Sequence, residues 1–223
     1  YDAFNYGGPS TIFWYERPWL KTLRQLSAGQ GWQDNNIKNY LRKFNIRAPV
    51  KTFGHHQTHA AAGYYTSGFD NACVLVIDAI GEFECLTRWD AIGNDLRKRQ
   101  SLEYPNSLGL FYSAMTQRCG LKPNEEEYIL MGMAAYGVPR YVEEMRDAFF
   151  SEWNLPNFKL RHNLHRGCRW WRYDDADLRD YSVAAATQKV YEEEFENLVI
   201  HAKMIDPFQE NLVLMGGCAL NCS

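Results

Sequence analysis

The sequence contains no uninterrupted apolar run near the roughly 20 residues that a helix needs to cross a bilayer. Its opening segment, residues 1–9, also lacks the basic-then-apolar order of a signal peptide. We therefore expect a cytoplasmic protein that has no membrane partner. Hydrophobic residues make up 46% of the 223 positions, which argues against disorder and suffices for one large domain or two small lobes.

The chain also has no large excess of either basic or acidic residues. The chain has 24 basic and 27 acidic residues, and its formal net charge is -3. Such a balance gives no long-range attraction to nucleic acid or to anionic lipid, so we expect no nucleic-acid partner. Any anion that the protein binds must be held by a local arrangement of groups.

The six cysteines include no CxxC pair, and several of them lie in apolar stretches. Buried cysteine behaves as a small hydrophobic residue, so reduced thiols are expected. Cys218 and Cys222 are four positions apart, but no second cysteine or histidine pair at zinc-finger spacing completes a site. A structural zinc ion is therefore not expected.

Helices and strands alternate in the predicted order. The run Ala72–Asp78 is apolar and β-branched, which is typical of a strand buried on both faces. Residues 82–90 and 96–104 follow as strands of an antiparallel meander, because a Gly-Asn-Asp turn separates them. The other predicted strands are 11–15, 50–53 and 211–215, and the predicted helices are 18–26, 36–44, 56–66, one capped by Asn106 or Ser107, and one that opens at Ser182.

This order favours an α/β fold in which helices flank a mixed sheet, with lobes of the actin-like or ribonuclease-H-like (ASKHA) type. We place the boundary between the lobes near Asn71. Residues 1–71 would form part of a first lobe, including a metal-binding helix, and residues 72–223 a second lobe.

A histidine cluster is the sharpest chemical feature. In the segment Gly54–Ala60, His55 and His59 are one helical turn apart, so both imidazoles can reach one metal ion. His56 would face elsewhere. The zincin proteases need a glutamate at the position of His56, so proteolysis is disfavoured. Taken alone, the pair could equally be histidines that form hydrogen bonds in a core.

Asp78 strengthens the metal hypothesis. It ends the buried strand, where active-site residues of α/β sheets collect, and we expect a tight turn over residues 79–82 directly after it. Two histidines and one carboxylate with open positions suit a divalent ion such as iron. Asp78 could also be a turn-forming residue, or the turn could receive a phosphate on its N–H groups.

Two glycine-containing segments, 131–137 and 216–221, have the pattern of nucleotide-binding loops. In the second, a buried strand ends in Gly216 and Gly217 before a helix start, so backbone amides could face a phosphate. The first, which contains Gly132, could equally reflect close backbone packing.

These segments, in this order, resemble the O-carbamoyltransferase family of nodulation and antibiotic-tailoring enzymes, whose first domain is similar to the Kae-type threonylcarbamoyl-transferring proteins. The matching stretches cover most of the chain, and the ordered set is far more specific than any single motif. They are Gly54–Ala60, Tyr64–Phe69, Val76–Glu82, Ser107–Tyr112, Met131–Gly137 and Met215–Asn221.

The resemblance implies Fe²⁺ or another divalent metal at His55, His59 and Asp78. It implies that ATP and carbamoyl phosphate give carbamoyl adenylate on a separate YrdC-like domain, and that this chain, as a piece of a longer protein, passes the carbamoyl group to a hydroxylated small-molecule acceptor. Gly132, Gly216, Gly217 and Asn221 would face the nucleotide, and His56 is the candidate general base.

The chain departs from the family pattern at two positions. Ile129 stands where the family commonly has lysine, and Ala79 where glycine is usual. A fourth metal ligand, an aspartate, is expected beyond Ser223. These departures leave two other hypotheses open: a threonylcarbamoyl-type or kinase-like transferase, and a catalytically silent nucleotide-binding module.

Two charged stretches remain. Residues 161–172 form a basic and aromatic island before Asp174, Asp175 and Asp177, and it predicts either a surface loop or a contact with acceptor or phosphate. Glu192–Glu194 is expected on the solvent-exposed face of the long helix.

Overall fold

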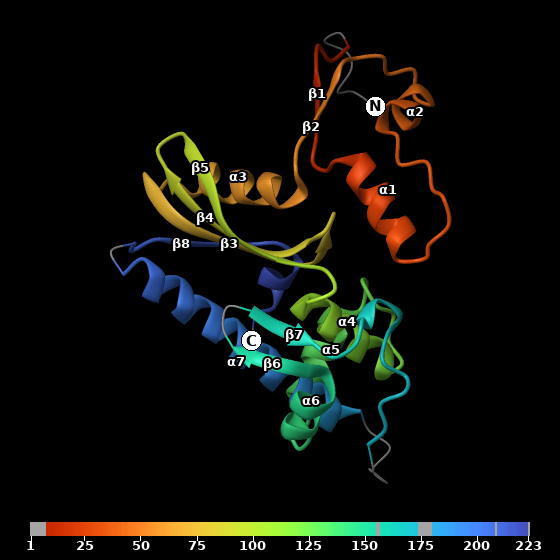
Figure 1. Ribbon diagram of the computed structural model, residues 1–223, viewed down its shortest axis with the longest axis vertical. Helices are drawn as coiled ribbons and strands as arrows, with labels where there is room; N and C mark the ends of the chain where they lie inside the picture. Colours follow the sequence, from red (N-terminus) through yellow and green to blue (C-terminus); the bar gives the residue numbers. More distant parts are fainter. Residues whose placement is uncertain (1–7, 155–156, 174–179, 208, 223) are drawn as a thin grey trace.

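The computed structural model describes residues 8–154, 157–173, 180–207 and 209–222 (Figure 1). Its centre is a mixed four-stranded sheet with the order β5-β4-β3-β8. The three strands of the meander pair in antiparallel fashion, as predicted, and β8 adds to β3 in parallel. The strands of this sheet are β3 (Asn71–Gly81), β4 (Glu84–Ile92), β5 (Asp95–Glu103) and β8 (Leu212–Met215).

Two small ribbons lie outside the central sheet. One is a parallel pair near the start of the described chain, and the other is an antiparallel hairpin. The remaining elements are β1 (Ile12–Trp14), β2 (Val50–Thr52), β6 (Phe150–Asn154), β7 (Asn157–Leu160), α1 (Pro18–Ser27), α2 (Ile37–Arg42), α3 (His55–Ser67), α4 (Leu108–Arg118), α5 (Glu127–Ala134), α6 (Val142–Phe149), α7 (Tyr181–Ile205), and the 3₁₀ helices η2 (Leu164–Arg166) and η3 (Gly217–Leu220). Five helices, α1 to α4 and α7, agree closely with the predicted ranges, whereas α5 and α6 were not predicted.

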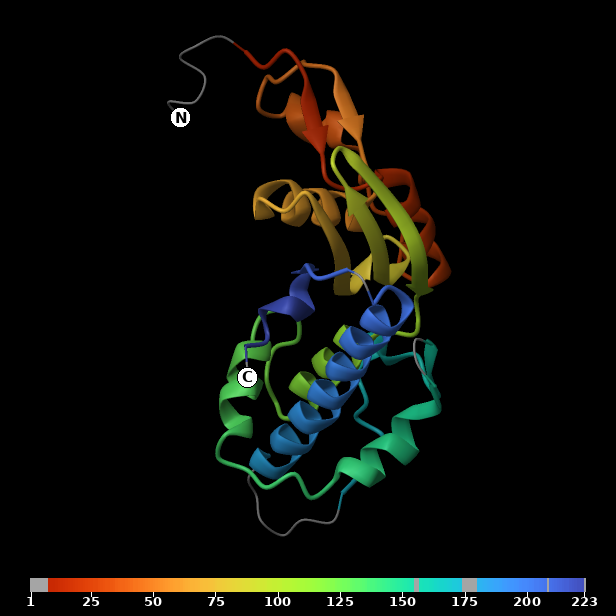
Figure 2. The same cartoon turned by 90° about the vertical axis from the view of Figure 1, so that its left-hand side faces the viewer.

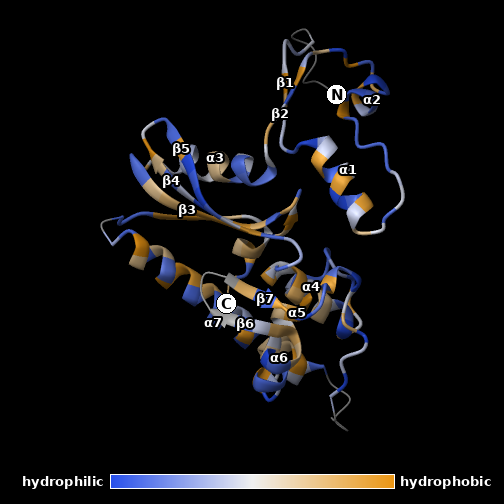
Figure 3. Ribbon diagram, viewed as in Figure 1, coloured by the Kyte–Doolittle hydropathy of each residue, from blue (hydrophilic) through white to orange (hydrophobic). Residues whose placement is uncertain are grey.

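Helices cover both faces of the sheet, as Figures 1 and 2 show. Ala60 and Tyr64 of α3 pack against Val74 and Val76 of β3 on one face. On the other face, α7 packs against alternate residues of the same strand. This two-sided burial explains why β3 reads as a continuous apolar run and lacks alternation. Figure 3 shows the contrast with β5, whose ribbon is mostly hydrophilic.

The division predicted at residue 71 stays a prediction. In the structure α3, which precedes it, packs on β3 and β8, which follow it. Among the described residues, no helix is both long and apolar enough to span a membrane.

The turn predicted over residues 79–82 is wrong. β3 continues to Gly81, and its register against β4 shifts between Ile77 and Gly81. The chain reverses at Glu82 instead, which has a positive φ of 52°. A shift of this kind lets a strand bend without ending, so the sequence pattern of a turn appears inside the strand.

The helix expected after Gly216 and Gly217 is only the short 3₁₀ helix η3. In the island at 161–172, Trp171 is buried in the core beside Phe149, so the segment is partly interior. The acidic residues predicted after it, 174, 175 and 177, lie outside the described residues.

Glu194 corrects another prediction, because it is 1% exposed rather than on the wet face of α7. Burial raises the pKa of Glu194 from 4.5 to about 7. The folded protein therefore keeps this proton up to about pH 7, whereas the unfolded chain releases it near 4.5. Protonation of Glu194 therefore stabilises the folded state, and its contribution to the free energy of unfolding falls as the pH rises from about 4.5 through 7.

We expect Glu194→Gln to stabilise the protein by about 2 kcal/mol at pH 8, because the neutral amide avoids burying a charge. The difference from wild type should shrink to near zero below pH 4.5. Urea unfolding at several pH values measures it. The exposed neighbour Glu196→Gln is the control, and an equal gain in both variants would contradict the assignment.

Candidate metal centre

The first turn of α3 presents the two predicted histidines to one point. Gly54 precedes the helix in extended conformation, and the helix then places His55 and His59 one turn apart. Their side chains are 17% and 32% exposed, so both remain reachable from solvent. The Nε2 atoms of the two rings are 3.1 Å apart.

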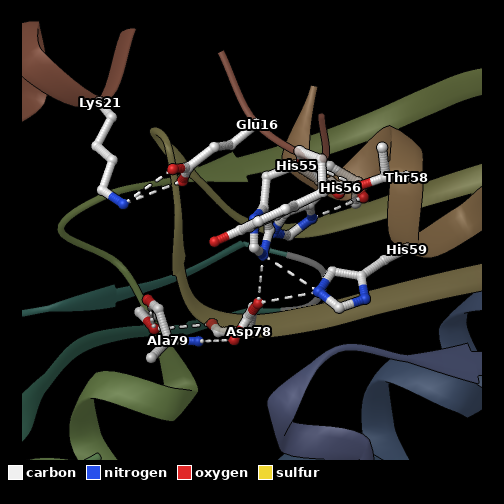
Figure 4. A network of polar contacts seen from close by, with 11 residues as sticks. Glu16, Lys21, His55, His56, Thr58, His59, Asp78 and Ala79 are labelled. Carbon is white, nitrogen blue, oxygen red and sulfur yellow. Dashed lines mark hydrogen bonds and ion pairs between the residues drawn. The ribbon is translucent and has the colours of Figure 1, made fainter. Parts of the chain in front are cut away.

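Asp78 comes to the same point from β3. The parallel pairing of β3 with β8 ends at Val76 opposite Met215, so Asp78 lies just where β3 loses this neighbour. Its Oδ2 atom is 3.0 Å from Nε2 of His55 and 3.5 Å from Nε2 of His59 (Figure 4). Sequence spacing and fold therefore bring together the three residues predicted as a ligand set.

The surroundings of Asp78 strongly favour the ionised form of its carboxyl group. Burial by itself raises the pKa of this carboxyl, but hydrogen bonds from His55 and His59 and the backbone N–H of Ala79 outweigh it. The net effect holds the pKa of Asp78 well below its ordinary value. Its second oxygen, Oδ1, accepts the Ala79 N–H at 2.9 Å, which fixes the carboxylate plane. An anionic, oriented carboxylate is what a cation site requires.

The three groups fit a divalent cation. One ligand atom from each residue lies within 4.8 Å of the others, and this is a cluster of two imidazoles and one carboxylate. Two imidazole nitrogens at hydrogen-bond distance from each other need a proton between them, and a cation at the same point would satisfy both lone pairs. Nitrogen and oxygen donors with open positions suit iron or a similar divalent ion.

His56 takes a different position from its neighbours. Its ring is fully buried, and Nδ1 is 2.9 Å from the hydroxyl of Thr87 on β4. Burial lowers the pKa of His56 from 6.5 to about 4, so the ring is neutral at pH 7. The predicted role of general base is not favoured by this geometry, because a buried ring cannot receive a proton from a ligand in an open cavity.

Glu82 is a residue of the site that sequence reasoning missed. Its carboxylate, 8% exposed, accepts hydrogen bonds from the backbone N–H groups of His55 and Arg17. Gly54 has no side chain to cap α3, so Glu82 supplies the missing acceptor from the far end of β3. In the sequence, the one sign that Glu82 belongs to the site is that it follows Asp78 by four positions.

We expect Glu82→Gln to weaken metal binding by about tenfold, because support of this kind orients a ligand without touching the ion. The loss of a charged cap should also lower stability by about 1 kcal/mol. Isothermal titration with Co²⁺ and urea unfolding measure the two effects. Exposed Glu103→Gln is the matched control, and unchanged Co²⁺ affinity in Glu82→Gln would exclude the positioning role.

Residues 10–223 match the family model described as carbamoyltransferase N-terminus. The chain belongs to this family.

Relatives agree with the family match. The chain is 36% identical over 188 residues to the uncharacterised protein sll1178 of Synechocystis, with 75% of this chain and 30% of that protein covered. It is 30% identical over 180 residues to nodulation protein NolO of Bradyrhizobium diazoefficiens, with 76% and 32% covered. The chain thus spans about a third of the length of these relatives. Membership of this family supports a transferase activity, namely carbamoyl transfer, at the level of the family.

In this carbamoyltransferase domain a cavity of about 450 Å³ opens beside Asp78. Asp78 lies in its wall together with two of the predicted nucleotide contacts, Gly217 and Asn221. The Asn221 side chain exchanges hydrogen bonds with Gln188, which also accepts the hydroxyl of Tyr112. This amide and phenol network stiffens one side of the cavity.

The other two predicted contacts lie elsewhere. Gly216 has a φ of 93°, and a Cβ there would lie 2.3 Å from the carbonyl oxygen of Ile77. Its conformation and close packing therefore require glycine even without a ligand. Gly132 is exposed on α5 and is not among the residues that line the cavity, whereas its neighbour Met131 is.

Proposed function

We propose that His55, His59 and Asp78 hold a divalent metal ion, with Fe²⁺ as the first candidate. The observation that carries the proposal is the convergence of their three ligand atoms within 4.8 Å. When bound, such an ion supplies Lewis-acid polarisation and a fixed point for oxygen atoms of a substrate. The cavity of about 450 Å³ beside Asp78 offers room for that substrate.

The proposed reaction is transfer of a carbamoyl group from carbamoyl adenylate to a hydroxyl of a small-molecule acceptor. A YrdC-like domain elsewhere in the protein would make the adenylate from carbamoyl phosphate and ATP. The family of the chain and its nodulation relative NolO support this proposal. We also propose the actin-like fold type, with the lobe boundary near residue 71, for the mixed sheet and its helices.

Residues of this chain have positional tasks in the proposal. Asp78 stays anionic at the cavity wall, and Gly217 leaves the carboxylate accessible, since a Cβ there would lie 3.1 Å from Oδ1. Glu127 accepts the hydroxyl of Ser113 and the N–H of Asn124, each at 2.6 Å, which fixes the opposite wall. Fixed walls keep a reacting hydroxyl in one orientation.

Product analysis tests the function. The full-length protein that contains this chain and the YrdC-like domain is incubated with carbamoyl phosphate, ATP and a panel of sugars and aminoglycosides, and products are examined by mass spectrometry. We expect an acceptor heavier by one carbamoyl group, with release of AMP. His59→Ala should abolish the product, while exposed Lys38→Ala should not.

Two other outcomes have defined meanings. A phosphorylated acceptor, or a product formed only with threonylcarbamoyl adenylate, would replace the proposal with the kinase-like or threonylcarbamoyl alternative. Nucleotide binding without any transfer, in a metal-loaded protein, would identify a silent binding module.

A further inference from the structure

A second cavity, of about 230 Å³, lies where α1, α4 and η2 meet. Arg24 from α1, Gln117 from α4 and His165 from η2 lie in its wall. It shares Ala79 and Ser113 with the larger cavity, so the two spaces adjoin. None of the three polar residues belongs to the metal centre.

Arg24 is the unusual group of this cavity. It is only 9% exposed, and its Nε atom is buried with no hydrogen-bond partner. Within the described part of the chain, no carboxylate forms an ion pair with Arg24. Glu16, whose charge acts on Arg24, is already bonded to Lys21 at 3.0 Å. Because a buried guanidinium without a counterion is strongly unfavourable, an anion bound in this cavity would stabilise Arg24.

His165 of η2 lines the same space, and Arg166 follows it in the chain. Burial, followed by the charges of Arg24 and Arg166, lowers the pKa of His165. His165 Nε2 accepts from Gln30 at 2.7 Å, so the neutral ring carries its proton on Nδ1 as a donor. Arg166 donates to the carbonyl of Ala28 at 3.4 Å, which ties η2 to the end of α1.

We propose that this second cavity binds the phosphate group of a small ligand, with Arg24 as the principal binding residue. A guanidinium presents paired N–H donors that match phosphate oxygens, and it binds them best where water is excluded. The site is separate from the proposed metal centre. Its ligand can therefore be free phosphate or a phosphate ester, and binding requires no carbamoyl transfer.

Thermal unfolding of the full chain in phosphate, against chloride at equal ionic strength, tests the proposal. Phosphate should raise the unfolding midpoint of wild type, and Arg24→Met should lose this effect, with phosphate affinity reduced about tenfold or more. Arg24→Lys keeps the charge and should retain part of the stabilisation by phosphate. Exposed Arg42→Met is the control and should behave as wild type.

The variant also separates a ligand site from a structural role. In phosphate-free buffer, Arg24→Met should be as stable as wild type or more stable, because it removes an unpaired buried charge. A large loss of stability there would reveal an internal counterion and overturn the proposal. Equal phosphate effects in wild type and Arg24→Met would also overturn it. Parallel titration with glucose 6-phosphate shows whether the ester or free phosphate binds better.

Discussion

Asp78→Asn should reduce metal affinity by at least about 100-fold, because it removes the only anionic group of the cluster among the described residues. The amide keeps the size and shape of the carboxylate, but it cannot offer the negative charge that holds a divalent cation beside two neutral imidazoles. If the proposed function holds, carbamoyl transfer should fall in proportion.

Elemental analysis of the purified full chain, with dialysis against defined free Fe²⁺, measures this effect. Asp95→Asn is the matched control, since Asp95 is exposed at the start of β5 and pairs with Arg97. The control should bind as wild type does. Equal metal content in Asp78→Asn and wild type would show that the ion, if any, is held elsewhere.

Gly81→Ala should disturb the centre from outside the ligand set. A Cβ at Gly81 would lie 2.5 Å from the ring of His55 and 2.7 Å from that of His56. His56 is fully buried against β4 and has no space to retreat, so the first turn of α3 must move. We expect metal affinity to fall about tenfold or more, with a loss of stability of about 1–3 kcal/mol from overpacking.

Gly31→Ala is the comparison for this variant, because a Cβ at that position meets nothing within 4 Å. In titration with Co²⁺ and in urea unfolding, Gly31→Ala should have the same metal affinity and the same stability as wild type. If Gly81→Ala also binds Co²⁺ like wild type, the helix start is free to adjust, and the contact between β3 and α3 does not position His55.

The ligand set was predictable because it depends on local geometry. A helix places residues four apart on one face, so the spacing of His55 and His59 was sufficient, and a buried strand that ends in a carboxylate pointed to Asp78. The same periodicity correctly directed His56 away from them. Its burial against Thr87 was not visible, because it depends on the register between β3 and β4.

Long-range contacts explain what the sequence did not predict. Glu82 caps α3 across 27 positions of sequence, and only the register shift near the end of β3 brings it there. The sequence pattern gave no sign that Arg24 of α1 is buried, because its 9% exposure depends on contacts between segments far apart in the chain. Glu194 stands in an acidic run whose neighbours are more exposed, so composition alone predicted a wet face.

X-ray absorption spectroscopy of the Fe²⁺-loaded full chain tests the central claim most directly. We expect one iron per chain, ligated by nitrogen and oxygen only, with the multiple-scattering pattern of two imidazoles that is lost in His55→Ala. An iron bound through sulfur, or a spectrum that His55→Ala leaves unchanged, would contradict the assignment of the centre to His55, His59 and Asp78.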